Sequence, residues 1–298
     1  MEIKEISIME LALSYDLPTV VKYYLTYSST IRLYSLVEGE EGIGYVLLQL
    51  QDKTVVEIKY IYIVKLKRNH GMGKYLLRQV LTRLREEQIE VWVTSIENSK
   101  SEQMMEGLFQ PYCLEVEQEK KLITYPLGIE TKAQWIRALQ PMQPLIEFIR
   151  NRMLVECVNI ENASETLMNN ILERSEVYFD TMYNPKQILC GIRGEVDKKC
   201  SCIAHRNEEP VAISIILKTN TTRAIFELVV VGKNQKNHGV FILPVTSSVQ
   251  AMEEQGYESF SLCIYKENNQ MQRIEQQMLG GIDSIVKRQV TYKIIEEK

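Results

Sequence analysis

The sequence predicts a mixed α/β protein made of two similar domains. A strand-like run over residues 55–64 leads through a glycine turn into a helix-like run over 75–84. The tripeptide Asn-His-Gly of that turn recurs later in the chain, with flanks that match at the same offset. The length of 298 residues is sufficient for two domains of ordinary size. Together these observations indicate that one α/β unit occurs twice.

The composition is that of a globular protein, with 45% hydrophobic and 25% charged residues. A net charge of −4 and a pI of about 5.7 do not favour a nucleic-acid partner. The first five residues lack the basic and apolar regions of a signal peptide, and no apolar run approaches membrane-spanning length. The six cysteines have no framework spacing, which indicates reduced thiols. We therefore expect a cytoplasmic protein with no nucleic-acid and no membrane partner.

The first half of the chain alternates between helix-like and strand-like runs. Before the glycine turn, apolar residues recur at helical spacing and then in β-branched runs. In chain order, the expected elements are a helix over 9–27, strands over 30–37, 42–50 and 55–64, a helix over 75–84, a strand over 90–96, a helix through 104–109, and strands over 112–116 and 121–125.

The glycine turn, residues 67–74, has the features of an anion site. The first amide groups of a helix have no partner within the helix, and the helix dipole adds partial positive charge there. Arg68 and Lys74 bracket the turn with full charges, while Gly71 and Gly73 let a phosphate approach the backbone. The turn is therefore predicted to bind a diphosphate.

Two familiar phosphate loops match this turn poorly. The dinucleotide-binding fingerprint requires a third glycine where Leu76 stands, and the P-loop requires Ser or Thr where Tyr75 stands. The turn instead resembles the R/Q-x-x-G-x-G/A motif of the GNAT acyl-CoA N-acyltransferases, read as Arg68-x-x-Gly71-x-Gly73. The order of elements extends the resemblance over residues 1–127. It implies a central mixed, mostly antiparallel sheet flanked by helices.

The resemblance also implies a reaction and the residues that hold its co-substrate. Enzymes of this family move an acetyl group from acetyl-CoA to an amine, and their loop binds the pyrophosphate of coenzyme A. The strand before the loop supplies a backbone N–H to the thioester oxygen, and an asparagine-led helix follows the next strand. Carried onto this chain, the coenzyme A residues are Ile61, Ile63, Val64, Arg68, Asn69, His70, Gly71, Met72, Gly73, Lys74 and Asn98.

Glu57 is the candidate general base. It lies 68 − 57 = 11 residues before Arg68, where several family members have a catalytic glutamate. In the absence of a bulge, strand alternation would put Glu57 on one face with Ile61 and Ile63. The alternative role is a structural carboxylate paired with Lys59.

The family's general acid is missing from its expected place. A tyrosine commonly stands seven residues after the asparagine of the helix motif, and 98 + 7 = 105 arrives at Met105. The coenzyme A thiolate can leave without a dedicated acid, so the sequence is compatible with an active enzyme. The alternative, from another class, is a non-catalytic acyl-CoA-binding sensor or scaffold protein.

A second copy lies at an offset of 239 − 71 = 168 residues. It repeats the order of the first, with strands over 223–231, 259–264 and 286–295 and a helix over 241–254. We therefore expect tandem GNAT-like domains over 1–127 and 145–298. The stretch 128–144, punctuated by glycine and proline, is the expected linker.

The second copy differs where coenzyme A would bind. Adding 168 to Gly73 gives Phe241, and adding it to Lys74 gives Ile242. A phenyl ring would crowd the backbone that a pyrophosphate must touch, and the cation is lost. We therefore expect a degenerate domain, kept for packing, substrate-pocket walls or dimerisation.

The function predicted from the sequence is an N-acetyltransferase that uses acetyl-CoA and acts on a primary amine of a small molecule or peptide. A homodimer is one assembly open to it. No metal is expected, because Cys200-x-Cys202-x-x-His205 has no fourth ligand at zinc-finger spacing.

Overall fold

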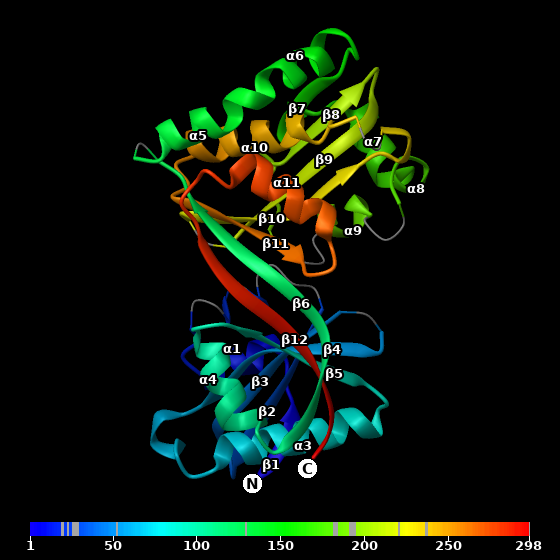
Figure 1. Ribbon diagram of the computed structural model, residues 1–298. Coiled ribbons are helices and arrows are strands. Elements are labelled where there is room, and N and C mark those ends of the chain that lie inside the picture. The colour runs from blue at the N-terminus through cyan, green and yellow to red at the C-terminus, as the bar shows by residue number, and fades with distance from the viewer. Residues whose placement is uncertain are drawn as a thin grey trace. The chain divides into compact units, whose positions relative to one another are not determined.

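A computed structural model describes residues 1–18, 21–22, 24–25, 30–51, 53–128, 130–180, 184–190, 195–219, 221–235 and 238–297 (Figure 1). The chain divides into two compact units. The N-terminal unit contains residues 1–120 and 287–298, and the C-terminal unit contains residues 121–286. Both chain ends therefore belong to the N-terminal unit, as the labels in Figure 1 show.

The N-terminal unit is built on a mixed sheet. Its strands are β1 (Glu2–Glu5), β2 (Ile31–Glu38), β3 (Glu41–Leu50), β4 (Val55–Ile63), β5 (Glu90–Ile96), the part of β6 (Tyr112–Pro126) up to residue 120, and the part of β12 (Ile285–Glu297) from residue 287. They lie in the order β1-β2-β3-β4-β5-β12-β6. Strands β4 and β5 pair in parallel, whereas β1–β2, β2–β3, β3–β4 and β5–β12 are antiparallel pairs.

Helices cover both faces of this sheet. Those given by the described residues include α1 (Ile8–Ser14), α3 (Met72–Glu86), α4 (Lys100–Met104) and the single turns η1 (Lys65–Lys67) and the π-helical η2 (Met105–Phe109). Helix α3 forms because its apolar side chains recur at helical spacing, and Leu76, Val80 and Leu84 of that stripe are fully buried against the sheet. On the other face, Leu11 of α1 packs with Tyr45 of β3.

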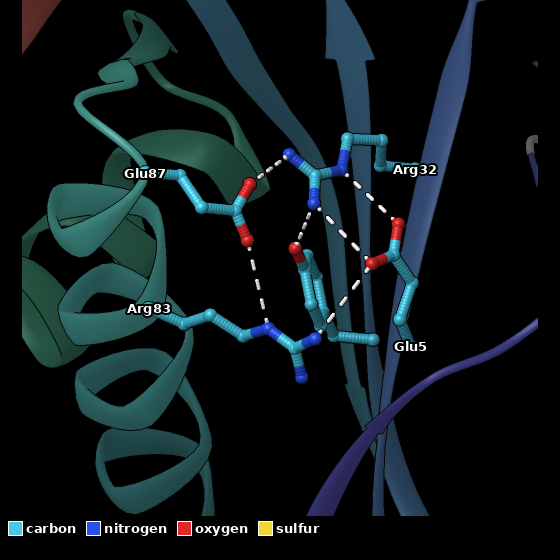
Figure 2. A network of polar contacts seen from close by, with 5 residues as sticks. Glu5, Arg32, Arg83 and Glu87 are labelled. Atoms are coloured by element: carbon cyan, nitrogen blue, oxygen red, sulfur yellow. Dashed lines mark hydrogen bonds and ion pairs between the residues drawn. The ribbon is translucent and has the colours of Figure 1, made fainter.

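A network of charges ties the outer strands to the end of α3 (Figure 2). The Arg32 guanidinium lies between two carboxylates, with Nη1 2.7 Å from Glu87 Oε2 and Nε 3.1 Å from Glu5 Oε1. Arg83 contacts the same two carboxylates at longer range. Both guanidinium groups lie over the ring of buried Tyr34. The network therefore joins β1, β2 and α3 around one aromatic ring.

The C-terminal unit repeats this arrangement. Its strands are residues 121–126 of β6, β7 (Glu156–Asn159), β8 (Cys202–Arg206), β9 (Glu209–Lys218), β10 (Arg223–Val231) and β11 (Ser259–Tyr265). Strands β10 and β11 pair in parallel, and β7–β8, β8–β9 and β9–β10 are antiparallel. Its helices are α5 (Lys132–Leu139), α6 (Gln143–Asn151), α7 (Glu165–Glu173), α8 (Ser175–Tyr178), α9 (Pro185–Leu189), α10 (Ile242–Glu254) and α11 (Asn269–Leu279), with η3 (Gln140–Met142), η4 (Ile160–Asn162) and η6 (Lys233–Gln235) as single turns.

The mixed, mostly antiparallel sheets with flanking helices confirm the predicted fold class. Some boundaries differ from the expected ones. The helix expected over 9–27 ends at Ser14, because Tyr15 is extended, and part of the remainder lies outside the described residues. The two strands expected over 112–116 and 121–125 form one strand, β6.

The compact units also differ from the expected domain limits. The expected linker, 128–144, contains helix α5 and the start of α6, and it belongs to the C-terminal unit. The last strand of the chain pairs with β5 and so belongs to the N-terminal unit rather than to the second domain. This pairing joins residues that are far apart in the sequence, which a local pattern does not reveal.

Candidate active site

Strand β4 parts from β5 halfway along its length. Its parallel pairing with β5 runs from Val55–Glu90 to Ile58–Val93, whereas it stays paired with β3 as far as Ile63. A β-bulge lies at the point of divergence, where Lys59 is the extra residue opposite β3. Among the described residues, the second half of β4 therefore has one edge without a partner strand.

The bulge changes which side chains share a face of β4. Ile58, Ile61 and Ile63 pack on the α3 side, while Tyr60 and Tyr62 pack on the opposite side. Glu57 lies on the opposite side as well, because its carboxylate bonds Thr94, which alternates with buried Val93. The shared face of Glu57, Ile61 and Ile63 was expected only in the absence of a bulge, and it does not form because Lys59 shifts the alternation by one residue.

The open edge of β4 presents two backbone N–H groups. Val64 N–H donates to the Ile43 carbonyl at 3.0 Å, so Val64 faces β3 and its amide is engaged. Backbone groups alternate in an antiparallel pair, so those of Ile61 and Ile63 point away from β3. The Ile63 carbonyl agrees with this, because it accepts from Arg68 Nε at 2.8 Å. Of the three residues expected to offer an N–H to a thioester, Ile61 and Ile63 retain that geometry and Val64 does not.

The loop after β4 arranges its charged groups around a left-handed turn. The Arg68 side chain folds back to the Ile63 carbonyl and lies 5.4 Å over the Tyr62 ring. His70 Nδ1 lies 2.7 Å from the Arg68 carbonyl oxygen. Asn69 has a positive φ of 62°, which asparagine tolerates better than most residues. The loop is therefore held by its own side chains.

The two glycines of the loop are required for different structural reasons. Gly71 is the N-cap of α3 with φ 75°, a left-handed conformation that strains any residue with a Cβ. Gly73 sits in the first helical turn, where an added Cβ would meet Leu108 Cδ2 at 3.1 Å. Met72 packs on the core, and Lys74 is exposed beside the first amide groups of α3. The helix start is thus an amide-lined, cation-flanked turn.

Within the part of the chain that the structure describes, the Glu57 carboxylate has three side-chain partners. Lys59 Nζ lies 2.7 Å from Oε2, and Gln51 Nε2 donates to the same oxygen at 3.0 Å. Thr94 Oγ1 donates to Oε1 at 2.8 Å and is itself 2.9 Å from Thr291 Oγ1. The pairing with Lys59 was anticipated from their spacing, whereas the threonine contacts were not.

The turn after β5 differs from the expected asparagine-led helix start. Asn98 is exposed with φ 54°, and Ser99 is the N-cap of α4. Asn98 N–H donates to Glu102 Oε2 at 2.8 Å. Met105 begins the π-helical turn η2 and packs against the core, so it offers no proton donor. Asn98 therefore does not initiate the helix itself.

The C-terminal unit has the same bulge in its strand β10. Glu227 is the extra residue of β10, at 59 + 168 = 227. Gly239 has φ 68°, like Gly71, whereas residues 236 and 237 lie outside the described ones. Phe241 lines an apolar cavity of about 40 Å³ together with Phe226. Ligand pockets typically measure ~300–1,000 Å³, so this space is far smaller than a coenzyme site.

Among the described residues, no group of three or more His, Cys, Asp or Glu side chains is arranged to hold a metal ion. Within the same residues, no helix is both long enough and apolar enough to cross a membrane.

Comparison with known proteins identifies the fold. Residues 8–108 match the model of the acetyltransferase (GNAT) family. A tandem GNAT protein from the clavulanic acid biosynthesis pathway, solved without acetyl-CoA, has a TM-score of 0.60 at 10% identity, covering 98% of this chain and 97% of that one. No curated protein matches the sequence significantly.

Two further solved structures agree with this identification. A GCN5-related N-acetyltransferase from Sphaerobacter thermophilus has a TM-score of 0.53 at 12% identity, covering 88% of this chain and 79% of that one. A GNAT-family acetyltransferase from Colwellia psychrerythraea has a TM-score of 0.52 at 11% identity, covering 99% and 100%. The chain thus has the fold of tandem GNAT proteins, and residues 8–108 carry a domain of the GNAT acetyltransferase family.

Proposed function

We propose that the protein is an acetyl-CoA-dependent N-acetyltransferase whose N-terminal unit binds the acyl donor and transfers its acetyl group to a primary amine. The observation that carries the proposal is the continuity of one open strand edge, β4, with the amide-lined start of α3. Such an arrangement suits a long co-substrate with an anionic end and a reactive end.

The residues of the loop fit the diphosphate of coenzyme A. A Cβ at Gly71 would point into open space, so the backbone there is approachable. The first amides of α3 and the exposed Lys74 supply donors and charge to an anion. Lys67 is paired with Glu38 at 2.5 Å, so it contributes less net charge than Lys74.

The proposed transfer has one covalent exchange. Acetyl-CoA supplies a thioester. The N–H groups of Ile61 and Ile63 would donate to its carbonyl oxygen, and preorganised donors of this kind are most effective as charge develops on that oxygen. Glu57 would take one proton from the acceptor ammonium, and the free amine then forms the new C–N bond as the C–S bond breaks. The nitrogen releases its second proton to solvent as the amide forms. The departing thiolate takes a proton from solvent.

The C-terminal unit is proposed to lack this function. Phe241 stands at the position of Gly73, and Ile242 stands at that of Lys74. Phe241 is packed with the apolar core of the unit. At these two positions the unit therefore has neither the glycine nor the cation of the N-terminal unit, which supports a degenerate domain.

A second candidate function is a non-catalytic acyl-CoA sensor or scaffold. Two observations favour it. The Glu57 carboxylate is held in an ion pair with Lys59. The position where the family commonly has a tyrosine as general acid is occupied by Met105, which packs against the core. A protein of this kind would bind acetyl-CoA in the same loop without turnover.

A coenzyme A release assay separates the two candidates. Purified protein is incubated with acetyl-CoA and a panel of primary amines that includes alkylamines, amino sugars and lysine peptides, and free thiol is followed over time. Turnover with at least one amine supports the enzyme. Acetyl-CoA binding by calorimetry without turnover on any amine supports the sensor. Absence of binding contradicts both.

A further inference from the structure

A chain of hydroxyl groups runs across three strands to the Glu57 carboxylate. Thr291 on β12, Thr94 on β5 and Glu57 on β4 are linked by contacts of 2.9 Å and 2.8 Å. Thr291 and Thr94 stand directly opposite each other in the antiparallel β5–β12 pair. Thr291 is only 6% exposed. Strand β12 is thus connected to the Glu57 carboxylate through two hydrogen bonds.

The chemistry of these groups determines which hydroxyl donates in each of the two hydrogen bonds. A carboxylate is only an acceptor, so Thr94 must donate its single hydroxyl proton to Glu57. Thr94 has no second proton, and therefore Thr291 must donate to Thr94. Hydrogen bonds that share a polarised hydroxyl strengthen one another in a buried setting. The Thr291 hydroxyl consequently acts on the carboxylate through Thr94.

The two threonines hold one oxygen of the carboxylate, and the other oxygen contacts one cation and one neutral amide. Thr94 contacts Oε1, while Lys59 and Gln51 both contact Oε2. A proton acceptor must keep its carboxylate within hydrogen-bond reach of the substrate, and small displacements are costly to rate. The uncharged contact at Oε1 fixes the carboxylate plane while an arriving ammonium competes for Oε2.

We propose that Thr94 and Thr291 are positioning residues for Glu57, and that the C-terminal strand β12 thereby completes the active site of the N-terminal unit. This inference rests on the proposed function, in which Glu57 is the base. It assigns a catalytic purpose to the last strand of the chain, which the sequence places in the second domain. It also means that residues 1–127 alone lack a part of the site.

The test compares matched variants of the full-length protein with the best amine of the release assay. Thr94→Val keeps the shape and the β-branching but removes the hydroxyl that contacts Glu57. Thr291→Val makes the same change at the residue that contacts Thr94. Thr94→Ser restores the hydroxyl. The control is Thr124→Val, because Thr124 Oγ1 makes a similar 2.8 Å contact with Ser261 between two strands of the C-terminal unit, without a carboxylate.

We expect Thr94→Val to lower kcat about ten-fold with the KM for acetyl-CoA unchanged, and Thr291→Val to lower it by a smaller factor. Thr94→Ser should recover most of the activity, and Thr124→Val should match the wild type. In a Glu57→Gln background, Thr94→Val should cause little further loss, because residues that act as one unit are not additive.

Two results distinguish failure of this inference from failure of the proposed function. If the wild type is active and Thr94→Val leaves kcat unchanged, the positioning role alone is overturned. The same conclusion follows if Thr94→Val lowers kcat by the same factor in the Glu57→Gln background as in the wild type. A wild type without turnover on any amine overturns the proposed enzyme and removes the positioning role with it. Folding of each variant is verified by its unfolding midpoint.

Discussion

The Lys59 ammonium lies 2.7 Å from the Glu57 carboxylate, at the bulge where β4 parts from β5. Both side chains are largely buried, with 19% and 12% of their surfaces exposed. This pair places a primary ammonium where the proposed mechanism requires the acceptor's ammonium to arrive. An acceptor must therefore share or replace the contact that Lys59 makes.

The first prediction follows from this competition. Lys59→Met should lower the KM for the amine by up to about five-fold, because it removes a like charge worth ~1 kcal/mol from the approach path. Acetyl-CoA affinity should not change. Lys59→Arg keeps the charge and should retain the wild-type KM. A higher amine KM in Lys59→Met would show that Lys59 assists the acceptor instead.

The second prediction concerns Glu57 itself. Glu57→Gln keeps the size and the acceptor oxygen but cannot take a proton. General-base contributions are typically ~10²–10⁴-fold, so turnover should fall by about two orders of magnitude while acetyl-CoA affinity stays within a few-fold. The pH optimum should move upward, because more of the amine must then arrive deprotonated. Wild-type turnover in this variant at neutral pH would remove Glu57 from the mechanism.

The third prediction compares two buried tyrosines of the N-terminal unit. The Tyr45 hydroxyl has no hydrogen-bond partner among the described residues. The Tyr15 hydroxyl contacts Ser35 at 2.8 Å and donates to the Gly44 carbonyl at 2.9 Å. An unsatisfied buried polar group costs ~1–3 kcal/mol, so Tyr45→Phe should stabilise the fold by about 1 kcal/mol and Tyr15→Phe should destabilise it by a similar amount. Denaturant unfolding measures both, and equal effects of the two changes would contradict this reasoning.

The fourth prediction concerns the network of Figure 2 and pH. The Arg32 hydrogen bond lowers the pKa of Glu87 below its ordinary value of 4.5. A carboxyl whose pKa is lowered in the folded state stabilises that state above its unfolded pKa, and the contribution is lost as pH falls through the folded value. The difference in Tm between the wild type and Arg32→Met should therefore be constant near neutral pH and shrink below about pH 4.5. A difference that stays constant into acid would contradict the ionic origin.

Local patterns predicted several strands and the glycine turn closely. Strands over 90–96 and 223–231 agree with β5 and β10, because β-branched runs bounded by polar residues are short-range signals. The left-handed cap at Gly71 agrees with the predicted glycine turn for the same reason. These signals lie within a few residues of each other, so no tertiary information was needed.

The parts of the site that the sequence did not predict arise from long-range pairing. The bulge at Lys59 exists only relative to β3, and it reversed the expected face of Glu57. The contact between Thr94 and Thr291 joins residues 197 positions apart. No periodicity connects such positions, so the sequence pattern grouped the last strand with the second domain, whereas this strand pairs with β5 in the N-terminal unit.

Calorimetric titration of acetyl-CoA into the wild type and Gly73→Phe tests the central claim most directly. The account predicts one acetyl-CoA bound per chain by the wild type and no detectable binding by Gly73→Phe, because a ring beside the first amides of α3 blocks approach to the backbone. Gly73→Ala, which only presses on the flexible end of Leu108, should bind with intermediate affinity. Unchanged affinity in a folded Gly73→Phe protein, or two molecules bound per chain, would contradict the claim that this loop is the chain's one acyl-CoA site.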